Sequence, residues 1–520
     1  MRLHELLPAA LIPSAHADLT VFGVTDDSRE VRFGFVFCAL LLSSGNGVKF
    51  CAQAAARGAQ VVIVPQGTPD ERLGLSDYDK TKVVILRHPD VPSLYAQLVA
   101  KFHPGRPATM AAVTGTNGKT STVSFIRDLW TTAGYQACSL GTLGLWSKGT
   151  RHTNVDATFT TFDAKSTQLI TSSLVPAVTH LALEASSHGL HQGRLDGLDF
   201  DVAVFTNFTQ DHLDYHRTMD AYFASKLLLF TQRLRASGTA IVNIDDQRGF
   251  LIARAARNRG CRLITFSSRG RAADLHVLRQ FANERGQTLL LSVFGQRHEV
   301  HAPVAGIFQA ENILAAIGAV VASGLDSSVA AQAVEQLESV PGRLERATIL
   351  DNGAVVYVDF AHTPDALRNV LASLRPHVRK GSRLHVVFGC GGDRDATKRP
   401  LMGRLASELA DIVLVTDDNP RTESPASIRS AILAAAPGAR DAGDRRTAIA
   451  RAISQLESGD ILVVAGKGHE DYQVLPVLSP SGELLLAADG KPLTHKVPFS
   501  DSRVIREIVS PGHVLAEAFC

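Results

Sequence analysis

The chain has 520 residues, of which 45% are apolar and 20% charged, and its formal net charge is +2. This length predicts about three domains of roughly 150 residues each, with enough apolar residues to bury several cores. The near-balanced charge argues against a nucleic-acid partner. Six cysteines include no CxxC pair, so we expect free thiols in a cytoplasmic protein, and neither a zinc site nor a disulfide framework.

The N-terminal segment 6–17, LLPAALIPSAHA, has an apolar centre and ends like a signal-peptide cleavage site. Glu5 offsets the charge of Arg2, however, and Pro8 and Pro13 interrupt the apolar run. We therefore expect this segment to fold as part of the first domain. Because no apolar run approaches about 20 residues, we also expect no membrane insertion.

Runs of apolar residues predict alternating strands and helices along the chain. In residues 1–107 the candidates are 33–42, 51–59 and 60–65, followed by a proline-containing linker at 101–109. In residues 108–340 the strand candidates are 108–115, 178–185, 200–207 and 238–245. In residues 341–520 strands at 354–360, 383–389, 411–417 and 460–466 alternate with helices at 364–374, 399–410 and 447–456. The sequence thus predicts an α/β protein of three domains: a smaller N-terminal α/β domain, a central parallel sheet and a C-terminal, Rossmann-like doubly wound sheet.

A candidate phosphate-binding loop follows the first strand of the central domain. Residues 112–122 read AVTGTNGKTST, and a helix candidate at 124–134 comes next. Gly115 and Gly118 would let backbone N–H groups approach phosphate oxygens at the helix N-terminus. This strand–loop–helix context is the one found in P-loop ATPases.

The loop also carries the side chains that phosphate chemistry needs. Lys119 would reach the terminal phosphates of a nucleotide, and Thr120 would place its hydroxyl on Mg²⁺. The general pattern asks for a glycine where this chain has Val113. The alternative interpretation is a tight turn with an accidental lysine, which the flanking strand and helix argue against.

Further polar strings accompany the loop string TGTNGKTS in a fixed order. They are LEASSHGLHQGRL (183–195), FTNFTQDHLDYH (205–216), AYFASK (221–226), VPGRLE (340–345), DFAHTPD (359–365), FGCGGDRD (388–395), TDDNPRTE (416–423) and AGKGHEDY (465–472). Together they resemble the motifs of the Mur ligase family over nearly the whole chain. That family commonly lacks the loop's first glycine, and the match is closest to its meso-diaminopimelate-adding members.

The resemblance implies an ATP-dependent, amide-forming ligase of peptidoglycan precursor synthesis. Its substrates would be ATP, UDP-N-acetylmuramoyl-L-alanyl-D-glutamate and meso-diaminopimelate. ATP would phosphorylate the side-chain carboxylate of the D-glutamyl residue, and an amine of diaminopimelate would then displace phosphate from the acyl phosphate. Phosphorylation is needed because the oxide of a free carboxylate is a poor leaving group.

The resemblance also implies residue roles around ATP. The expected ATP-binding residues are Gly115, Thr116, Asn117, Gly118, Lys119, Thr120, Ser121, Asn312, Arg343 and Asp359. The expected catalytic residues are Lys119, Glu184, His212 and Lys226, and the expected Mg²⁺ ligands are Thr120, Glu184, His212 and Lys226. Lys226 would be carbamylated by CO₂ to N6-carboxylysine, which turns a cation into an anion that can bind the metal. The family usually has an asparagine where Gln309 stands, and His362 is a weaker candidate near ATP.

For the UDP-sugar dipeptide, the resemblance implies contacts from hydroxyl, amide and guanidinium groups. The expected residues are Ser28, Thr160, Thr161, Ser186, Gln192 and Arg194. Hydroxyls and amides suit sugar and pyrophosphate oxygens, whereas Arg194 suits an anion. The chain departs from the family pattern at Phe162 and in 41–50, where an Asp-Gly pair is usual.

For diaminopimelate, the expected residues are Arg394, Asp418, Asn419, Pro420, Arg421, Gly466 and Glu470. Diaminopimelate resembles lysine with a second carboxylate, which the paired donors of Arg421 match. A lysine substrate would leave that guanidinium unpaired. The alternative interpretation of 418–421 is a polar turn, but its position after a sheet strand favours a ligand site. The string DNPR is typical of the diaminopimelate-adding members.

Three other functions stay open. A ligase that adds L-lysine conflicts with Arg421, and a folylpolyglutamate synthase, which shares the general fold, conflicts with DNPR and with DDSR at 26–29. A non-catalytic nucleotide-binding or scaffold protein conflicts with the complete set of catalytic candidates. We expect a monomer whose partners are these small molecules.

Overall fold

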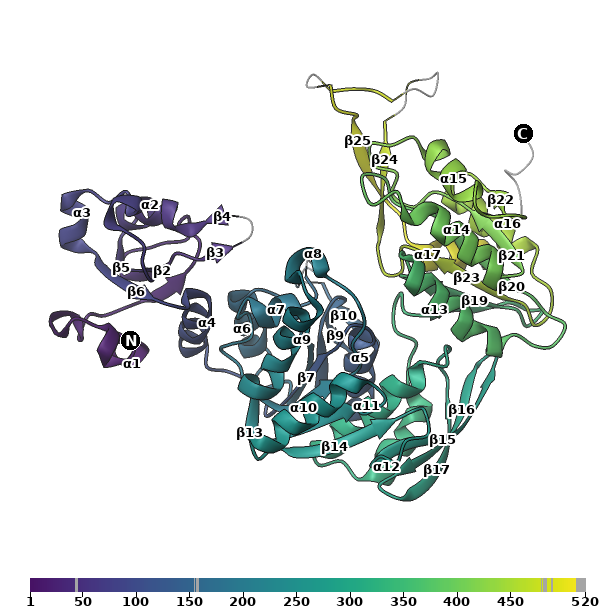
Figure 1. The fold of residues 1–520 in the computed structure, drawn as a ribbon, viewed down its shortest axis with the longest axis horizontal. Helices are drawn as coiled ribbons and strands as arrows, with labels where there is room; N and C mark the ends of the chain where they lie inside the picture. Colours follow the sequence, from purple (N-terminus) through teal and green to yellow (C-terminus); the bar gives the residue numbers. More distant parts are fainter. Residues whose placement is uncertain are drawn as a thin grey trace. The chain divides into compact units, whose positions relative to one another are not determined.

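The computed structural model describes residues 1–42, 45–153, 155, 159–477, 479, 484–487 and 490–510. By its internal contacts the chain forms two compact units, the first made of 1–267 with 315–326 and the second of 268–314 with 327–520. Figure 1 labels the elements of both units along the chain. Ser43 and Ser44, in the divergent segment 41–50, and Cys520 lie outside the described residues.

The first unit begins with a small parallel sheet of order β1-β2-β5-β6. Its strands are β1 (Gly23–Thr25), β2 (Phe35–Cys38), β5 (Ala59–Pro65) and β6 (Val84–His88), and β3 (Leu41–Leu42) pairs separately with β4 (Gly45–Asn46). Its helices are α1 (Leu3–Leu6), α2 (Cys51–Ala56), α3 (Asp77–Lys82) and α4 (Val91–Phe102), with short 3-10 turns at Ala9–Leu11, Ser14–His16, Gly47–Phe50 and Asp70–Leu73. Leu6, Leu7 and Ile12 are buried in the core of this sheet, so the segment 6–17 is folded, as the sequence predicted.

The same unit continues with eight strands of a larger sheet, in the order β10-β9-β8-β11-β7-β12-β13-β14. The parallel strands are β7 (Thr109–Thr114), β8 (Ala137–Gly141), β11 (His180–Glu184), β12 (Phe200–Phe205), β13 (Leu234–Asn243) and β14 (Arg262–Ser267), while β9 (Gly144–Ser147) and β10 (Thr150–His152) form an antiparallel edge. The helices are α5 (Lys119–Thr132), α6 (Ala164–Ser173), α7 (Ser187–His191), α8 (Leu213–His216), α9 (Met219–Leu228) and α10 (Gln247–Asn258), and a π-helical turn at Leu229–Arg233 extends α9. α5 packs on β8 and β11, and α10 packs on β13 and β14. The continuous apolar strands are buried because helices cover them.

The second unit starts with three antiparallel strands and continues with a doubly wound sheet. The antiparallel strands are β15 (Leu275–Asn283), β16 (Gly286–Val293) and β17 (Gln296–Ala302), and α12 (Ser327–Gln332) and a 3-10 turn at Ala333–Gln336 also belong to this unit. Of α11 (Gln309–Ala322), residues 309–314 belong to this unit and residues 315–322 to the first. The doubly wound sheet has the order β18-β19-β23-β20-β21-β22. Its strands are β18 (Glu345–Ile349), which is antiparallel, β19 (Val355–Asp359), β20 (Leu384–Phe388), β21 (Ile412–Val415), β22 (Arg440–Asp441) and β23 (Ile461–Ala465).

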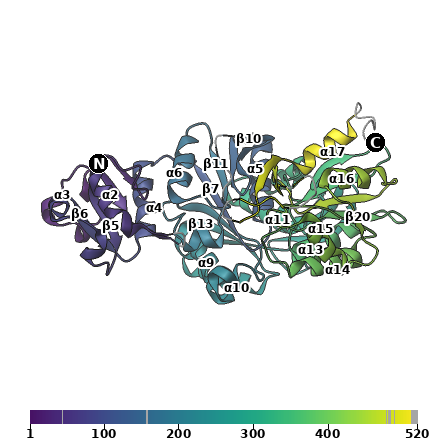
Figure 2. The ribbon, with the colours of Figure 1, turned by 90° about the horizontal axis from the view of Figure 1, so that it is seen from above.

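Helices cover both faces of the doubly wound sheet. One apolar core joins it to α13 (Pro364–Leu374), α14 (Lys398–Leu409) and α15 (Pro425–Leu433), with a 3-10 turn at Arg375–His377. A second core joins the other face to α16 (Arg445–Ser454) and α17 (Asp501–Val509). Figure 2 shows α16 and α17 on the opposite side of this sheet from α13 and α14. The strands β24 (Tyr472–Pro476) and β25 (Thr494–Pro498) form a separate antiparallel pair.

These elements confirm the predicted α/β class, with a parallel central sheet and a doubly wound C-terminal sheet. The predicted domain boundaries at 107/108 and 340/341 stay predictions. Within the described ranges, no helix has both the length and the apolar character needed to cross a membrane.

Candidate active site

The candidate phosphate loop connects β7 to α5. Gly115 has a φ of +152°, and a Cβ there would lie 1.9 Å from the hydroxyl oxygen of Thr206. Gly118 has a φ of +83° and directly precedes α5. Both positions require glycine, the first for close approach and the second for a left-handed turn. The first turn of α5 therefore presents its N–H groups at the loop, which is a favourable place for a phosphate.

Two lysines converge on this loop. Lys119 Nζ donates to the carbonyl oxygens of Gly115 at 3.0 Å and Thr116 at 2.8 Å. Lys226 Nζ, from α9, donates to the same Gly115 carbonyl at 2.8 Å and lies 4.4 Å from the centre of the Tyr222 ring. The Lys226 residue is only 1% exposed. Burial, reinforced by the charge of Lys119, lowers the pKa of Lys226 well below its ordinary value.

Glu184 ends β11 and is 2% exposed. Its Oε2 accepts from the Thr120 hydroxyl at 3.1 Å and the Thr142 hydroxyl at 3.3 Å, and its Oε1 accepts from the Thr142 backbone N–H at 2.8 Å. A Cβ at Gly141 would lie 2.3 Å from Oε1, so the carboxylate needs glycine beside it. The structure thus brings Thr120 and Glu184 into direct contact at the start of α5.

The oxygen atoms of this cluster fit a magnesium ion. Mg²⁺ takes oxygen ligands and usually shares them with substrate phosphates and water. The hydroxyl of Thr120 and the carboxylate of Glu184 supply such atoms, and a carbamate on Lys226 would add another. Over the described part of the chain, His, Cys, Asp and Glu side chains alone form no group of three that could hold a metal. A magnesium ion here would therefore depend on the hydroxyl, the carbamate or bound phosphate as well.

His212 lies in the loop after β12 and starts α8 in a left-handed conformation, with a φ of +51°. Its Nε2 is 3.4 Å from Asp211 Oδ2, and its ring centre is 4.7 Å from that of His188. His216, four residues on, is buried and hydrogen-bonded to Ser187 at 3.0 Å. Burial, together with nearby histidines, lowers the pKa of His216 to about 4. His212 itself is partly exposed, so it is accessible to a ligand.

Most of the expected sugar-peptide residues form one network that begins at Glu184. The Thr161 hydroxyl donates to the Glu184 carbonyl at 2.8 Å and accepts from the Ser186 N–H at 2.9 Å. Arg194 Nη1 donates to the Thr161 carbonyl at 2.6 Å, and its guanidinium contacts Gln192 Oε1 and the ring of Phe159. Burial lowers the pKa of Arg194.

The two remaining sugar-peptide candidates, Thr160 and Ser28, are bonded to other residues. Thr160 accepts a hydrogen bond from the Thr142 hydroxyl at 3.1 Å, which links it to the same cluster. Ser28 instead lies beside the small N-terminal sheet, where its hydroxyl donates to Gln53 Oε1 at 2.8 Å.

In the second unit, Asp359 ends β19 and is buried. Its two carboxylate oxygens accept from the N–H groups of Leu344 and Ala361, each at 2.8 Å, so the carboxylate fastens the VPGRLE loop to the sheet. Burial raises the pKa of Asp359 above its ordinary value. The guanidinium of Arg343 stacks 5.0 Å from the centre of the Phe360 ring.

The remaining ATP candidates have protein partners of their own. Asn312 Nδ2 donates to Gln309 Oε1 at 2.8 Å. Gln309, which stands where the family usually has an asparagine, therefore holds the side chain of the ATP-binding candidate Asn312. His362 Nδ1 is hydrogen-bonded to the Phe360 carbonyl at 3.0 Å, and burial lowers the pKa of His362.

The predicted arginines, Arg394 and Arg421, lie on adjacent loops after β20 and β21. Arg421 Nη1 donates to the Gly392 carbonyl at 2.7 Å, and the Gly392 N–H donates to the Asn419 carbonyl at 2.9 Å. The loop after β20 also contacts Pro420, since a Cβ at Gly392 would lie 1.9 Å from its carbonyl oxygen. Arg394 is exposed two residues further along this loop. The two loops thus share one edge of the sheet.

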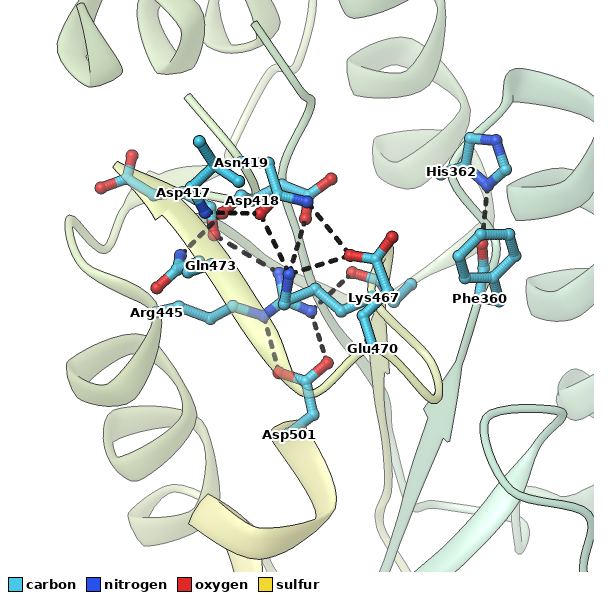
Figure 3. A network of polar contacts seen from close by, with 12 residues as sticks. Phe360, His362, Asp417, Asp418, Asn419, Arg445, Lys467, Glu470, Gln473 and Asp501 are labelled. Atoms are coloured by element: carbon cyan, nitrogen blue, oxygen red, sulfur yellow. Dashed lines mark hydrogen bonds and ion pairs between the residues drawn. The ribbon is translucent and has the colours of Figure 1, made fainter. Parts of the chain in front are cut away.

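Asp418, Asn419 and Glu470 surround a lysine that the sequence analysis did not select (Figure 3). Lys467 Nζ donates to Asn419 Oδ1 at 3.2 Å and to Glu470 Oε2 at 3.0 Å, and lies 3.7 Å from Asp418 Oδ1. Gly466, with a φ of +118°, turns the chain between β23 and this lysine. All the predicted amino-acid candidates therefore belong to loops at the carboxyl edge of the doubly wound sheet, where ligands of such sheets bind.

Besides Lys467, the sequence patterns did not predict roles for Arg445, Asp501 and Thr142. Arg445 makes two hydrogen bonds to Asp501, at 2.7 and 2.8 Å, and donates to the Ala465 carbonyl at 2.9 Å. Thr142, which holds Glu184, stands in the unremarkable string GTLG. The sequence signal for Lys467 is its place between two glycines directly after a strand, within the motif AGKGHEDY (465–472).

Several known proteins resemble this chain in sequence and in fold. Residues 113–320 match the Mur ligase middle domain, and 342–468 match the Mur ligase, glutamate ligase domain. The UDP-N-acetylmuramoyl-L-alanyl-D-glutamate–2,6-diaminopimelate ligase of Caulobacter vibrioides is 45% identical, covering 88% of this chain and 92% of its own length. The ligase of that name from Brucella melitensis is 42% identical, with coverages of 91% and 95%. A solved structure of a ligase of that name has a TM-score of 0.72 at 33% identity and covers 98% of both chains. This chain therefore belongs to the Mur ligase family.

Proposed function

We propose that this protein is the ATP-dependent ligase that joins meso-diaminopimelate to UDP-N-acetylmuramoyl-L-alanyl-D-glutamate in peptidoglycan precursor synthesis. The observation that carries the proposal is the match, over about nine tenths of the chain, to relatives named for this reaction. The placement of Arg421, Asp418 and Glu470 on neighbouring loops supports the choice of diaminopimelate.

The first chemical step is phosphoryl transfer. An oxygen of the D-glutamyl side-chain carboxylate attacks the γ-phosphorus of ATP, the bond to the β-phosphate oxygen breaks, and ADP leaves with that electron pair. The N–H groups at the start of α5 and the ammonium of Lys119 offset the charge on the transferred group. We assign Gly115 to Ser121 to the phosphates, and Asn312, Arg343 and Asp359 to the rest of ATP.

Thr120, Glu184, His212 and carbamylated Lys226 would hold magnesium. Magnesium, when bound, would neutralise phosphate charge that the protein's cations leave unbalanced. The carbamate forms when the neutral Lys226 amine attacks CO₂ and loses one proton. The burial of Lys226 favours this step because it disfavours the charged ammonium.

The sugar-peptide candidates orient the carboxylate that reacts. Thr161 and Ser186 are bonded to the segment that carries Glu184, so a substrate held by them and by Thr160, Gln192 and Arg194 would lie close to the phosphate loop. Ser28, on the small N-terminal sheet, would bind a more distant part of the UDP-sugar. Arg194 suits an anionic group of this substrate.

The second step is amide formation. The neutral amine of diaminopimelate attacks the carbonyl carbon of the acyl phosphate, the C–O bond to phosphate breaks, and the nitrogen loses a proton. Arg394 and Arg421 are the candidates for the far carboxylate, with Asn419, Pro420 and Gly466 shaping the loops around the substrate. Glu470 and Asp418 are the candidates for the ammonium that does not react.

A cytoplasmic location and a monomeric state complete the proposal. Both substrates of the first step are nucleotides, and Cys38, Cys51, Cys138, Cys261 and Cys390 are free and buried, which suits a reducing compartment.

The proposal is tested with the purified protein, ATP, Mg²⁺, bicarbonate and the UDP-sugar dipeptide. Phosphate release and the mass of the product are compared for diaminopimelate, L-lysine and no amino acid. We expect one phosphate per amide formed, and kcat/KM at least about 100-fold higher for diaminopimelate than for lysine. Equal rates for the two amino acids would overturn the substrate assignment. No substrate-dependent phosphate release from the folded protein would overturn the ligase.

A further inference from the structure

A buried lysine, Lys467, lies beside the loops that carry the expected diaminopimelate residues, and no role has yet been assigned to it. Lys467 follows β23 and is 0% exposed. An ammonium group is costly to bury unless acceptors surround it, so its neighbours indicate its role. Those neighbours are three side chains of the expected diaminopimelate site, as Figure 3 shows.

The amide of Asn419 is fixed at both ends by this arrangement. Its Oδ1 accepts from Lys467 Nζ at 3.2 Å and from the Val474 N–H at 3.0 Å, while its Nδ2 donates to Glu470 Oε2 at 3.1 Å. The Arg421 N–H donates to the Val474 carbonyl at 3.1 Å. Val474, in β24, therefore holds the 419–421 loop through its backbone, and Lys467 holds the loop through a side chain.

The carboxylates of Glu470 and Asp418 both lie close to the ammonium group of Lys467. Lys467 Nζ is 3.0 Å from Glu470 Oε2 and 3.7 Å from Asp418 Oδ1. Asp418 Oδ1 is buried and, among the described residues, receives no hydrogen bond. Without a cation between them, the two neighbouring carboxylates would repel each other. Lys467 keeps them together and leaves Asp418 with an acceptor to offer.

A second buried cation supports the backbone at the same edge. Arg445 is bonded to Asp501 with both side chains 0% exposed, and it also donates to the carbonyl of Ala465, the residue that ends β23. Gln473 donates to the Asp418 carbonyl at 2.7 Å. The chain on both sides of Lys467 is thus held, so the position of its ammonium is set by the fold.

We infer that Lys467 is a positioning residue for the amino-acid substrate, which places Asn419, Glu470 and Asp418 to receive the substrate's ammonium group. The inference rests on the proposed function and deepens it. Lys467 acts through these residues, since its own ammonium would repel the substrate's. Its loss should therefore weaken amino-acid binding and leave the chemistry of ATP unchanged.

The test compares Lys467→Met with wild type in two assays. In the first, KM is measured for diaminopimelate, for ATP and for the UDP-sugar dipeptide. In the second, hydroxylamine replaces diaminopimelate and traps the acyl phosphate as a hydroxamate, which needs no amino-acid site. We expect the KM for diaminopimelate to rise about 30-fold, with the KM for ATP and the hydroxamate rate within about twofold of wild type.

Two further variants separate positioning from folding. Lys467→Met combined with Glu470→Gln removes the stranded carboxylate, so it should fold even where the single variant does not, and its KM for diaminopimelate should stay raised without the two effects adding. Arg383→Met is the control, because Arg383 pairs with Asp460 and Glu457 at the opposite edge of the sheet. It should lose stability but keep a wild-type KM.

The outcomes distinguish this inference from the proposed function. A wild-type KM for diaminopimelate in the folded single or double variant overturns the role of Lys467. A fall in the hydroxamate rate equal to the fall in amide formation overturns it too, because the defect would then lie in the first step. If wild-type protein forms neither product, the proposed function itself fails.

Discussion

The two clusters of candidate site residues, one in each unit, handle buried charge in opposite ways. In the first unit, Lys119 and Lys226 both donate to the carbonyl of Gly115, and Lys226 is bonded to backbone oxygen rather than to a carboxylate. In the second unit, Lys467 is bonded to Glu470 and Arg445 to Asp501. The lysines of the first cluster thus share a backbone carbonyl, whereas the buried cations of the second cluster contact carboxylates.

This difference follows from the ligands that we propose. A triphosphate brings several negative charges, which the ammonium of Lys119 can offset, and CO₂ needs an amine that is not strongly protonated, which the lowered pKa of Lys226 favours. Diaminopimelate carries both signs of charge and must be distinguished from lysine by the position of one carboxylate. Such discrimination depends on groups fixed in advance, which ion pairs and hydrogen bonds provide.

The largest expected effect tests the first cluster. Lys226→Ala removes the amine that would carry the carbamate, and we expect phosphate release to fall about 10²- to 10³-fold, the usual cost of losing one group that stabilises developing charge. Formate or acetate should partly restore the rate by supplying the missing carboxylate. Wild-type protein given ¹³C-bicarbonate should also display a carbamate carbon signal that the variant lacks.

The control for this experiment is Lys80→Ala, which removes an exposed lysine from α3 and should leave the rate unchanged. A fully active Lys226→Ala variant would contradict the carbamate role. It would also end the contrast between the clusters, because Lys226 would then be a structural lysine.

A smaller effect is expected in the second cluster. Arg421→Lys keeps the charge but loses the paired donors, so we expect the KM for diaminopimelate to rise about 10- to 100-fold while kcat changes little. The preference for diaminopimelate over lysine should fall by a similar factor. Steady-state assays with both amino acids measure this, with Arg404→Lys on the exposed side of α14 as the control. Unchanged discrimination would mean that another group reads the second carboxylate.

Sequence patterns predicted β7, β11, β12 and β13 in the first unit and β19, β20, β21 and β23 in the second, because buried parallel strands are short apolar runs bounded by turns. The strands β8, β14, β18 and β22 were not predicted. The same patterns also predicted polar residues at the ends of the predicted strands or after them, such as Glu184 at the end of β11 and Asp418 after β21. Neither Lys467 nor Thr142 could be selected in this way. A lysine between glycines is usually exposed, and a threonine in a turn is ordinary, so only the packing of distant segments reveals what they contact.

The same limit applies to pairs of residues. Arg445 and Asp501 are separated by 56 positions, and nothing in their local sequence links them. Asp359 is a different case: its motif predicts a contact with ATP, yet both its carboxylate oxygens accept hydrogen bonds from backbone N–H groups of the protein. Its structural role depends on the folded loop, which a motif does not describe.

The smallest expected effect on activity tests the space that Gly141 leaves for the Glu184 carboxylate. Gly141→Ala would place a Cβ 2.3 Å from Glu184 Oε1, so the carboxylate must move away from Thr120 and Thr142. We expect a roughly 10-fold loss of kcat and a destabilisation of about 1–3 kcal/mol, the usual cost of overpacking. Gly149→Ala is the matched control: its Cβ would meet nothing within 4 Å, but its φ of +71° makes the change cost about 1–2 kcal/mol of strain. If both variants lose stability but only Gly141→Ala loses activity, the position of the Glu184 carboxylate matters to the reaction. Equal activity in the two variants would instead place Glu184 outside the chemistry, and the first cluster would then depend on its lysines alone.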